Sequence, residues 1–534
     1  MKKLLSVLLC ILLTMQLCVL ASAAGTVYYI DSVSGSDANS GLSENAAWQS
    51  AAKLRGLALN PGDQVLFKRG GTYPCTLELN CSGTKEAPIV ISAYGFGERP
   101  LLTTDQHTEV LTLTDCSYVT VSGLEITAHN GGGIWINTEK KESDGITVTD
   151  MKIHDIQNYK VTSRDSQSRP RDARACMMVK CLAYPSPSLY RVNNLTVTDC
   201  EMYDCGNGLL LWGAFAPESH SPWAETDNDV TLIYNQNTYV ADCYFHDMDA
   251  EAMIIGQTEN AWVTRCRAID CCQGEGVDEN GERLYYTAPM WFWGGLNSTV
   301  DHCEIAGARN VGDGMAVDFD SWTNGCTYQY VYSHDNTCFV CNCPYGNEGQ
   351  HNNTVRYCLS VNDNHGKKRN EVGGNDDHGE QGLRFYNNTI INCNDFTFDG
   401  TQNSLFANNI IIPVEGHWVT TGSDNIGNTF TGNCFYNCLS PLCDFFARNT
   451  DPCFAVGSYE LSAKSPLLGK GIKIEDGLTE DFFGNPLTQN NIGCYAGEGA
   501  PGVCTREMPL QKIVRLVREA FLYIVRYFRE EVFD

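Results

Sequence analysis

The stretch Leu-Thr-Val-Thr-Asp-Cys-Glu-Met-Tyr-Asp (195–204), followed by Gly-Leu-Leu-Leu-Trp (208–212), is one copy of a pattern that the chain repeats. Other copies of its first part are Ile-Thr-Val-Thr-Asp-Met-Lys-Ile-His-Asp (146–155) and Thr-Val-Asp-His-Cys-Glu-Ile-Ala (299–306). Apolar and polar residues alternate in each copy, as in strands with one buried face. A unit this short cannot bury its apolar face alone, so neighbouring copies must stack. The pattern predicts a solenoid of parallel strands that rises about 4.8 Å per coil.

The second strand of each copy carries a column of outward-facing residues. Its copies include Gly-Ile-Trp-Ile-Asn (133–137), Pro-Met-Trp-Phe-Trp (289–293) and Gly-Met-Ala-Val-Asp (314–318). The apolar second and fourth residues should point inward, which sends the fifth residue to the outer face. Aligned in this way, the outer column reads Asn137, Lys180, Trp212, Gly256, Trp293, Asp318 and Cys341. Tryptophan and aspartate are therefore expected to share one outer face.

Charge and the N-terminal segment limit the class of protein. The chain has 37 Lys and Arg against 64 Asp and Glu, a formal net charge of −27. This charge repels nucleic acid, so no nucleic-acid partner is expected. Residues 1–23 combine Lys2, Lys3, an apolar run and a final Ala-Ser-Ala, which is typical of a secretory signal peptide. The protein is expected to be secreted and to lie outside the cell or at its surface.

Cysteine is abundant, with 26 residues, two of them in the predicted signal. Stacked thiols that act as small apolar side chains are the expected explanation, and structural disulfides are the alternative. A zinc site is less favoured because no histidine at ligand spacing completes one, so no metal site is assigned. The cysteines expected in one internal stack are Cys200, Cys243, Cys266, Cys303 and Cys358.

Segments near both ends of the chain resemble a known superfamily. Pro-Gly-Asp-Gln-Val-Leu-Phe-Lys-Arg-Gly-Gly-Thr-Tyr (61–73) and Tyr-Val-Thr-Val-Ser-Gly-Leu-Glu-Ile (118–126) are similar to the opening coils of bacterial parallel β-helix proteins of the pectate-lyase-like superfamily. Phe-Gly-Asn-Pro-Leu (483–487) and Asn-Ile-Gly-Cys-Tyr (491–495) resemble their closing segment. The resemblance implies an all-β, right-handed parallel β-helix over residues 24–496. It does not decide the reaction, because the superfamily includes polysaccharide lyases, glycoside hydrolases and depolymerases.

Helices are expected to cover both ends of the β-helix. Residues 45–59 should form an N-terminal capping helix, and a linker at 497–507 should lead to a basic amphipathic helix at 508–534. Two roles stay open for this second helix. It can dock on an anionic membrane or cell-surface polymer, or it can cap the last coil, whose strand edges need cover.

Long insertions flank the strand with the outer column and should form the walls of a groove. Indole rings stack on the CH faces of sugars, so a row of outward tryptophans predicts a polysaccharide or oligosaccharide site. Packing beneath a loop is the alternative for each of them. The tryptophans expected along the groove are Trp135, Trp212, Trp291 and Trp293.

Asp318 and Asp320 are two residues apart in one strand, so both should leave the same face about 6.6 Å apart at the backbone. Two negative charges this close raise the proton affinity of one carboxylate, which yields an acid and a base or nucleophile from the same side-chain type. Ca²⁺ binding and a purely solubilising role are the alternatives. His334 is expected beside this pair as a third catalytic residue.

Further polar residues are expected to contact the substrate. Glu251 and Asp313 align just before their strands, two coils apart. Asp376, Asp377 and His378 lie in a loop that is expected to fold over the groove.

Charge then separates the candidate reactions. Hydrolysis needs two carboxylates and a water. A lyase instead needs a base near the α-proton of a uronate and a cation that neutralises the uronate carboxylate. An acidic groove with tryptophan favours a neutral glycan. The sequence therefore predicts a secreted, monomeric glycoside hydrolase with no required cofactor. A Ca²⁺-dependent polysaccharide lyase and a non-catalytic glycan-binding protein are the alternatives.

Overall fold

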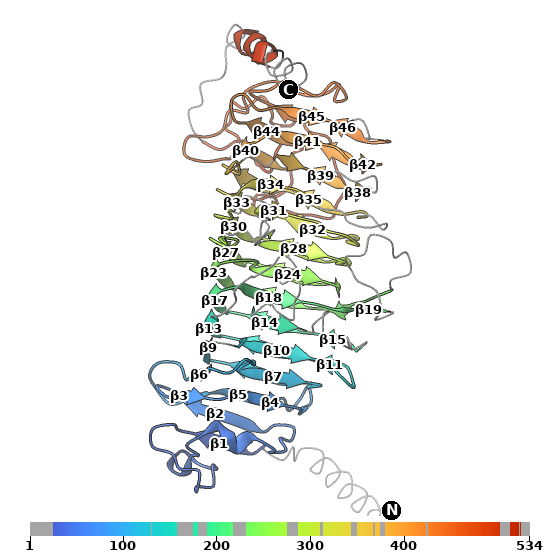
Figure 1. Ribbon diagram of the computed structural model, residues 1–534. Helices are drawn as coiled ribbons and strands as arrows, with labels where there is room; N and C mark the ends of the chain where they lie inside the picture. The colour runs from blue at the N-terminus through green and yellow to red at the C-terminus, as the bar shows by residue number, and fades with distance from the viewer. Residues whose placement is uncertain are drawn as a thin grey trace, which may run out of the picture.

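The computed structural model describes residues 25–129, 131–156, 175–179, 190–216, 231–274, 287–309, 313–342, 350–366, 369–373, 380–422, 426–501, 513–522 and 524. Its strands are stacked into an elongated solenoid that rises from the first coil to a helix above the last one (Figure 1). No helix among these residues is long and apolar enough to cross a membrane.

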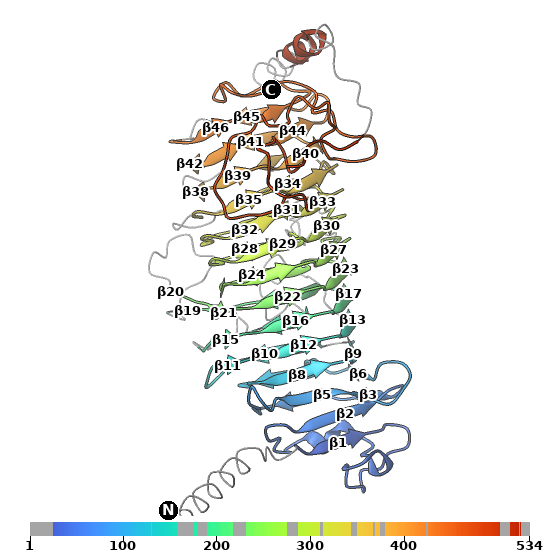
Figure 2. The ribbon, with the colours of Figure 1, turned by 180° about the vertical axis from the view of Figure 1, so that it is seen from behind.

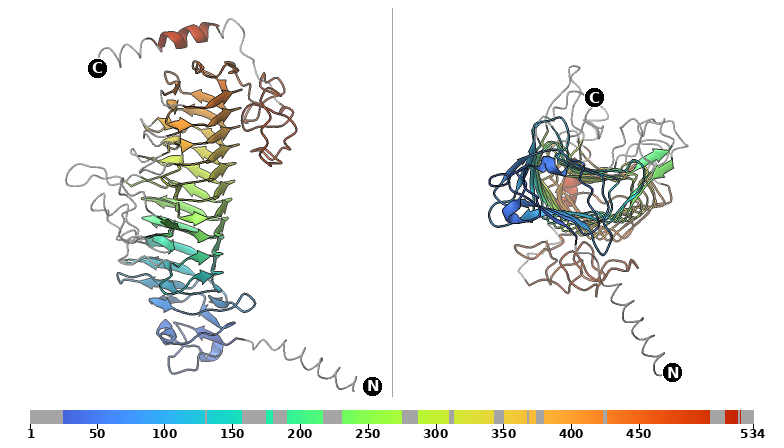
Figure 3. Two further views of the ribbon diagram at one scale, coloured as in Figure 1. Left: turned by 90° about the vertical axis from the view of Figure 1, so that its right-hand side faces the viewer. Right: turned by 90° about the horizontal axis from the view of Figure 1, so that it is seen from below.

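In the lower and middle coils, each coil contributes one strand to each of three main sheets, and above β28 (Met290–Trp293) separate sheets of two and three strands continue the third side. One coil consists of β8 (Val119–Ser122), β9 (Glu125–Ala128) and β10 (Ile134–Asn137). The strands pair in parallel with those of the next coil and build sheets of 14, 13 and seven strands. Figure 2 shows the opposite side of the stack, and the view along the axis in Figure 3 shows the sheets enclosing the interior.

The interior is one long apolar core, built as the alternation of the repeats requires. Val148 pairs with Val197, and both are fully buried. The predicted thiol stack is present: all five cysteines are at most 2% exposed, and Val331 occupies the position between Cys303 and Cys358. The cysteines are free among the described residues. They therefore fill the core as small apolar side chains.

Aspartates at the strand ends turn the chain. Asp155, Asp204, Asp247, Asp270 and Asp335 all adopt a left-handed backbone with φ between 49° and 57°. Aspartate tolerates this conformation better than most residues because its short side chain bonds to nearby backbone. Their recurrence reflects the geometry of the turns.

The N-terminal cap differs from the expected helix. It has only two 3₁₀ turns, η1 (Glu44–Ala46) and η2 (Ala51–Leu54). The residue before each turn is extended and makes no side-chain capping bond. Trp48, Ala51 and Leu54 nevertheless cover the first coil, because Trp48 bridges to Ile30 and all three are buried.

After the last strand, β47 (Cys434–Phe435), the chain folds back along the outside of the solenoid. Tyr330 donates to the carbonyl of Glu480 over 2.7 Å, and Tyr386 donates to Asp476 over 3.0 Å. Asn387, just after a strand of the 14-stranded sheet, donates to the carbonyls of Asn491 and Gly493 in the predicted closing segment. The returning chain therefore packs on the outside of this sheet, visible beside the upper coils in Figure 3.

Candidate active site on the outer face of the seven-stranded sheet

The seven-stranded sheet carries a second apolar cluster on its outer face. In β28 (Met290–Trp293), Met290 and Phe292 belong to the interior core, whereas Trp291 and Trp293 belong to the outer cluster. Trp212, just after β18 (Asn207–Leu211), lies in the same cluster. We call this surface, from Glu78 through Trp291 and Trp293 to Asp318 and Asp320, the site face. The tryptophans lie on the outer face of their strands, as the alternation of apolar residues predicted.

Their exposure was predicted wrongly. Trp212, Trp291 and Trp293 are only 2%, 8% and 1% exposed, and Trp135 is half-buried. Trp293 packs edge-on against Trp212 with ring centroids 5.4 Å apart. Leu232 also packs on this cluster, from the hairpin of β19 (Ala214–Ala216) and β20 (Thr231–Ile233) at one edge of the solenoid (Figure 2). The tryptophans form a covered wall and not an open platform.

The alignment of the two aspartates needs a correction of two residues. Phe292 bridges to Phe319, where the sequence alignment had paired it with Val317. The backbone N–H of Phe292 donates to the carbonyl of Asp318, and that of Asp320 donates back to Phe292. Asp320 therefore neighbours Trp293, and Asp318 neighbours Trp291. The outer face is unchanged because a shift of two preserves the alternation.

Both aspartates lie on the site face and are nearly excluded from water. Asp318 is 5% exposed and Asp320 is 6% exposed, while Phe319 between them fills the interior core. The Oδ1 atom of Asp320 accepts a 2.7 Å bond from the backbone N–H of Ser321 and a weaker one from its hydroxyl. Ser321 was not singled out from the sequence, although its position directly after Asp320 suits an N–H donor.

Burial raises the pKa of Asp320 to about 7. The two bonds from Ser321 act in the opposite direction, and the charge of Asp313 raises the pKa further. An aspartate in this state holds a proton near neutral pH and can donate it.

Glu251 and Asp313 lie just before their strands, two coils apart, where the sequence alignment placed them. Glu251 precedes β24 (Met253–Gly256), and Asp313 precedes β31 (Met315–Val317). Burial raises the pKa of Glu251 to about 8, and the charge of Asp313 contributes to that rise. The half-buried Asp313 therefore acts on two buried acids, Glu251 and Asp320.

The prediction that His334 accompanies the aspartates is wrong. His334 ends β33 (Tyr332–His334) in the 13-stranded sheet, where it pairs with Ala306 and Val361. Its ring nitrogens contact Asp335 at 2.8 Å and Glu304 at 3.2 Å. His154 makes the same pair of contacts, with Asp155 and Glu125. His334 therefore belongs to a repeated motif on another face of the solenoid.

One group of the predicted site remains to be placed. Asp376, Asp377 and His378 lie outside the described residues. Within the described part of the chain, no three His, Cys, Asp or Glu side chains are arranged to hold a metal ion.

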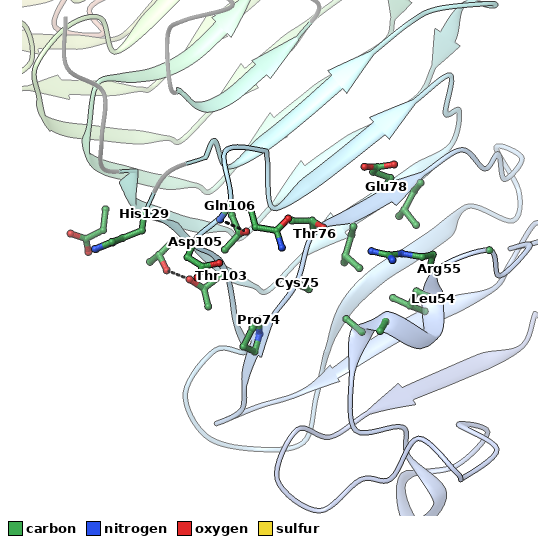
Figure 4. Close-up of a pocket in the computed structure, with 18 residues that line it drawn as sticks. Leu54, Arg55, Pro74, Cys75, Thr76, Glu78, Thr103, Asp105, Gln106 and His129 are labelled. Carbon is green, nitrogen blue, oxygen red and sulfur yellow. Dashed lines mark hydrogen bonds between the residues drawn. The ribbon is translucent and has the colours of Figure 1, made fainter.

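A cleft of about 1020 Å³ lies at the opposite end of the same sheet, beside β4 (Leu77–Leu79) (Figure 4). Arg55, Glu78, Asp105, Gln106 and His129 line it, and all of them are exposed. Its lining includes no tryptophan and no buried carboxyl group. The acids around Asp320 are therefore the stronger candidate for chemistry.

Known proteins resemble this chain in sequence and in fold. No protein-family model matches it. Lacto-N-biosidase from Bifidobacterium longum subsp. longum is 25% identical over 547 residues, which cover 84% of this chain and 33% of that protein. The chain thus spans about a third of the length of the curated relative that it matches.

The solved GH136 lacto-N-biosidase from Eubacterium ramulus, as its selenomethionine derivative, aligns with a TM-score of 0.53 and 20% identity, over 79% of this chain and 68% of that chain. Its native form gives a TM-score of 0.51 at the same identity and coverage. The parallel sheets, the stacked coils and this similarity show that the chain folds as a right-handed parallel β-helix.

Proposed function

We propose that this protein is a glycoside hydrolase that cleaves a neutral oligosaccharide at the site face. Asp320 is the proposed general acid, and Asp313 is the proposed second carboxyl group of the reaction. The observation that carries the proposal is the buried Asp320 carboxyl group, whose pKa is raised to about 7 while Asp313 adds a negative charge nearby. Glycoside hydrolysis requires two carboxyl groups, one of which donates a proton to the leaving group.

In the proposed reaction one of these two carboxyl groups donates a proton and the other acts as nucleophile or base. Asp320 donates its proton to the glycosidic oxygen as the bond from that oxygen to the anomeric carbon breaks. Asp313 either attacks the anomeric carbon or takes a proton from the attacking water. In both cases the hydroxyl group of water ends on the anomeric carbon. The reaction uses no metal, so activity should persist after treatment with a chelator.

The other acids receive supporting roles. Asp318 lies on the same face, beside Trp291, and is the alternative partner for Asp320. Glu251 is proposed to hydrogen-bond the substrate as a neutral carboxyl group, since the pKa of its side chain is raised to about 8. The half-buried Trp135 is proposed to contact the sugar, and the buried Trp212, Trp291 and Trp293 are proposed to support the site face from within.

The name of the relative suggests the first substrate to test. Both the curated relative and the solved structure are lacto-N-biosidases. We propose a lacto-N-bioside as the substrate and propose that the protein works after export, as residues 1–23 indicate. Incubation with a chromogenic lacto-N-bioside and a panel of neutral glycans tests this directly.

Three neutral variants test the assignment of the acids. Asp320→Asn and Asp313→Asn should each lower kcat by several orders of magnitude with the fold intact, because the amide cannot exchange the proton. Asp318→Asn should retain most of the activity. Glu380→Gln is a matched control, since it neutralises another buried acid whose pKa is raised to about 8 but which hydrogen-bonds to Asn353.

The chemical outcome separates the alternatives. Restoration of activity to Asp313→Asn by azide, with a glycosyl azide as product, would show that Asp313 acts as nucleophile or base. If Asp318→Asn is inactive and Asp313→Asn is active, the pair is Asp318 and Asp320. An unsaturated uronate product would replace hydrolysis by elimination, and glycan binding without any product would indicate a non-catalytic protein.

A further inference from the structure

The helix at the C-terminal end leaves a set of apolar side chains exposed. Residues 513–522 are helical, and Figure 3 shows the helix lying across the end of the stack. Five apolar side chains on it are more than half exposed: Ile513 58%, Val514 60%, Val517 65%, Phe521 64% and Ile524 52%. Amphipathic helices normally bury such side chains, so this surface lacks the cover that its composition favours.

The two basic residues in the described part of the same helix contact the solenoid. Arg515 donates to Asn449 over 2.6 Å, and its guanidinium group lies 4.6 Å from the ring centroid of Tyr436. Arg518 forms an ion pair with Glu415. The helix is therefore held on the last coils by its cationic side, and these two arginines do not face outward with the apolar residues.

Four of the exposed residues have the spacing of a helix-pairing seam. Val514, Val517, Phe521 and Ile524 are separated by three, four and three residues, which is the pattern of core positions in two-stranded coiled coils. We propose that this face pairs with the same face of a second copy of the chain and joins two solenoids end to end.

Charge favours a second copy over an anionic membrane. The chain carries a net charge of −27, which repels anionic lipid, and Arg515 and Arg518 already have protein partners. Pairing at the tips of two elongated molecules keeps most of their like charges far apart, where salt screens them. The self-association is independent of the proposed hydrolysis and departs from the monomer expected from the sequence.

Neighbouring residues enlarge the apolar surface. Leu442 is 93% exposed and lines a cavity of about 880 Å³ together with Val514 and Leu522. Phe445 and Phe446, a few residues further on, are 90% and 73% exposed. The helix face by itself offers five exposed apolar residues, which is few beside the roughly 20–30 residues a side of a standard interface, so a reversible dimer of modest affinity is expected.

Sedimentation velocity of the full chain over a wide concentration range tests the proposal. The wild-type protein should show a reversible monomer–dimer equilibrium. Phe521→Asp should weaken the dimer by roughly tenfold or more, because it places an unpaired charge in the seam. Phe96→Asp is the matched control, since it makes the same change at a fully exposed phenylalanine near the N-terminal coils.

A photo-crosslinking amino acid at position 517 locates the contact. The crosslinked peptides should both come from the C-terminal helix. A protein that stays monomeric at every concentration, a dimer that resists Phe521→Asp, or equal weakening by Phe96→Asp would overturn the proposal. Sedimentation of the wild-type protein with phosphatidylcholine vesicles, abolished by Phe521→Asp without a change in oligomeric state, would assign the face to lipid instead.

Discussion

At Asp320 burial and a neighbouring negative charge both raise the pKa, while two hydrogen bonds from Ser321 lower it. Removal of the Ser321 hydroxyl should therefore raise the pKa further. If Asp320 is the general acid, the rate falls as pH rises through its pKa of about 7. We expect Ser321→Ala to move the alkaline limb of the kcat/KM profile upward by a fraction of a pH unit.

Thr323 supplies the control for that measurement. Its hydroxyl donates to the backbone carbonyl of Asp320 over 2.6 Å and does not contact the carboxyl group. Thr323→Val should therefore leave the alkaline limb in place. An unchanged profile in Ser321→Ala would remove Asp320 from the titration that controls the rate.

The tryptophans should separate into structural and binding residues. Trp293 is 1% exposed, so Trp293→Ala should destabilise the fold by roughly 3–5 kcal/mol. Trp135 is only half-buried, and Trp135→Ala should instead raise KM with little change in stability. Chemical denaturation and steady-state kinetics on both variants measure the two effects. A stable Trp293→Ala protein would contradict the buried wall.

At the scale of elements, a ladder of asparagines holds the upper coils in register. Asn409 accepts a 3.0 Å bond from the backbone N–H of Asn388 and donates to the carbonyl of Phe385 over 2.9 Å. Both groups are buried, so Asn409→Ala should cost roughly 1–3 kcal/mol for each group left without a partner. Asn364→Ala, which removes an exposed amide bond to the backbone carbonyl of Asn392, should cost far less. Equal losses in unfolding free energy would show that the ladder adds nothing.

The alternation of apolar residues predicted which face each strand shows, but it could not predict register. Pairing of Phe292 with Val317 or with Phe319 leaves the same side chains outward, so only the packed coil distinguishes the two alignments. The burial of Trp212 could not be predicted from the repeat either, because Leu232 packs on its cluster from the separate hairpin of β19 and β20. His334 was misplaced because its strand lies on a neighbouring sheet of the same coil.

For the whole molecule, the titration of several buried groups lowers the stability of the fold as pH rises. Burial raises the pKa of Glu251 and Glu380 to about 8, so both acids are protonated in the folded state at mildly acidic pH. The two raised pKa values add to the free energy of unfolding. This stabilisation is complete below the pKa that the acids have in the unfolded chain, and it is lost as pH rises through about 8. For His334, burial lowers the pKa, but the bonds to Asp335 and Glu304 raise it overall, so its contribution is also lost with rising pH.

Thermal unfolding should show this trend. We expect the highest Tm near about pH 5 and a fall toward about pH 8. Glu380→Gln should make that fall shallower, because the amide does not titrate, whereas the exposed Glu98→Gln should not change the slope. A Tm that rises over this interval would contradict the direction of the shifts.

The free thiols of the internal stack affect whether unfolding of the protein is reversible. Buried in the folded state, they are shielded from oxidants, but unfolding releases them together and allows random cross-linking in air. Refolding yield after denaturation should therefore be high with a thiol reductant and low without one. In an aerated medium, loss of the protein would then be irreversible, and its survival would be governed by how fast it unfolds and not by its equilibrium stability.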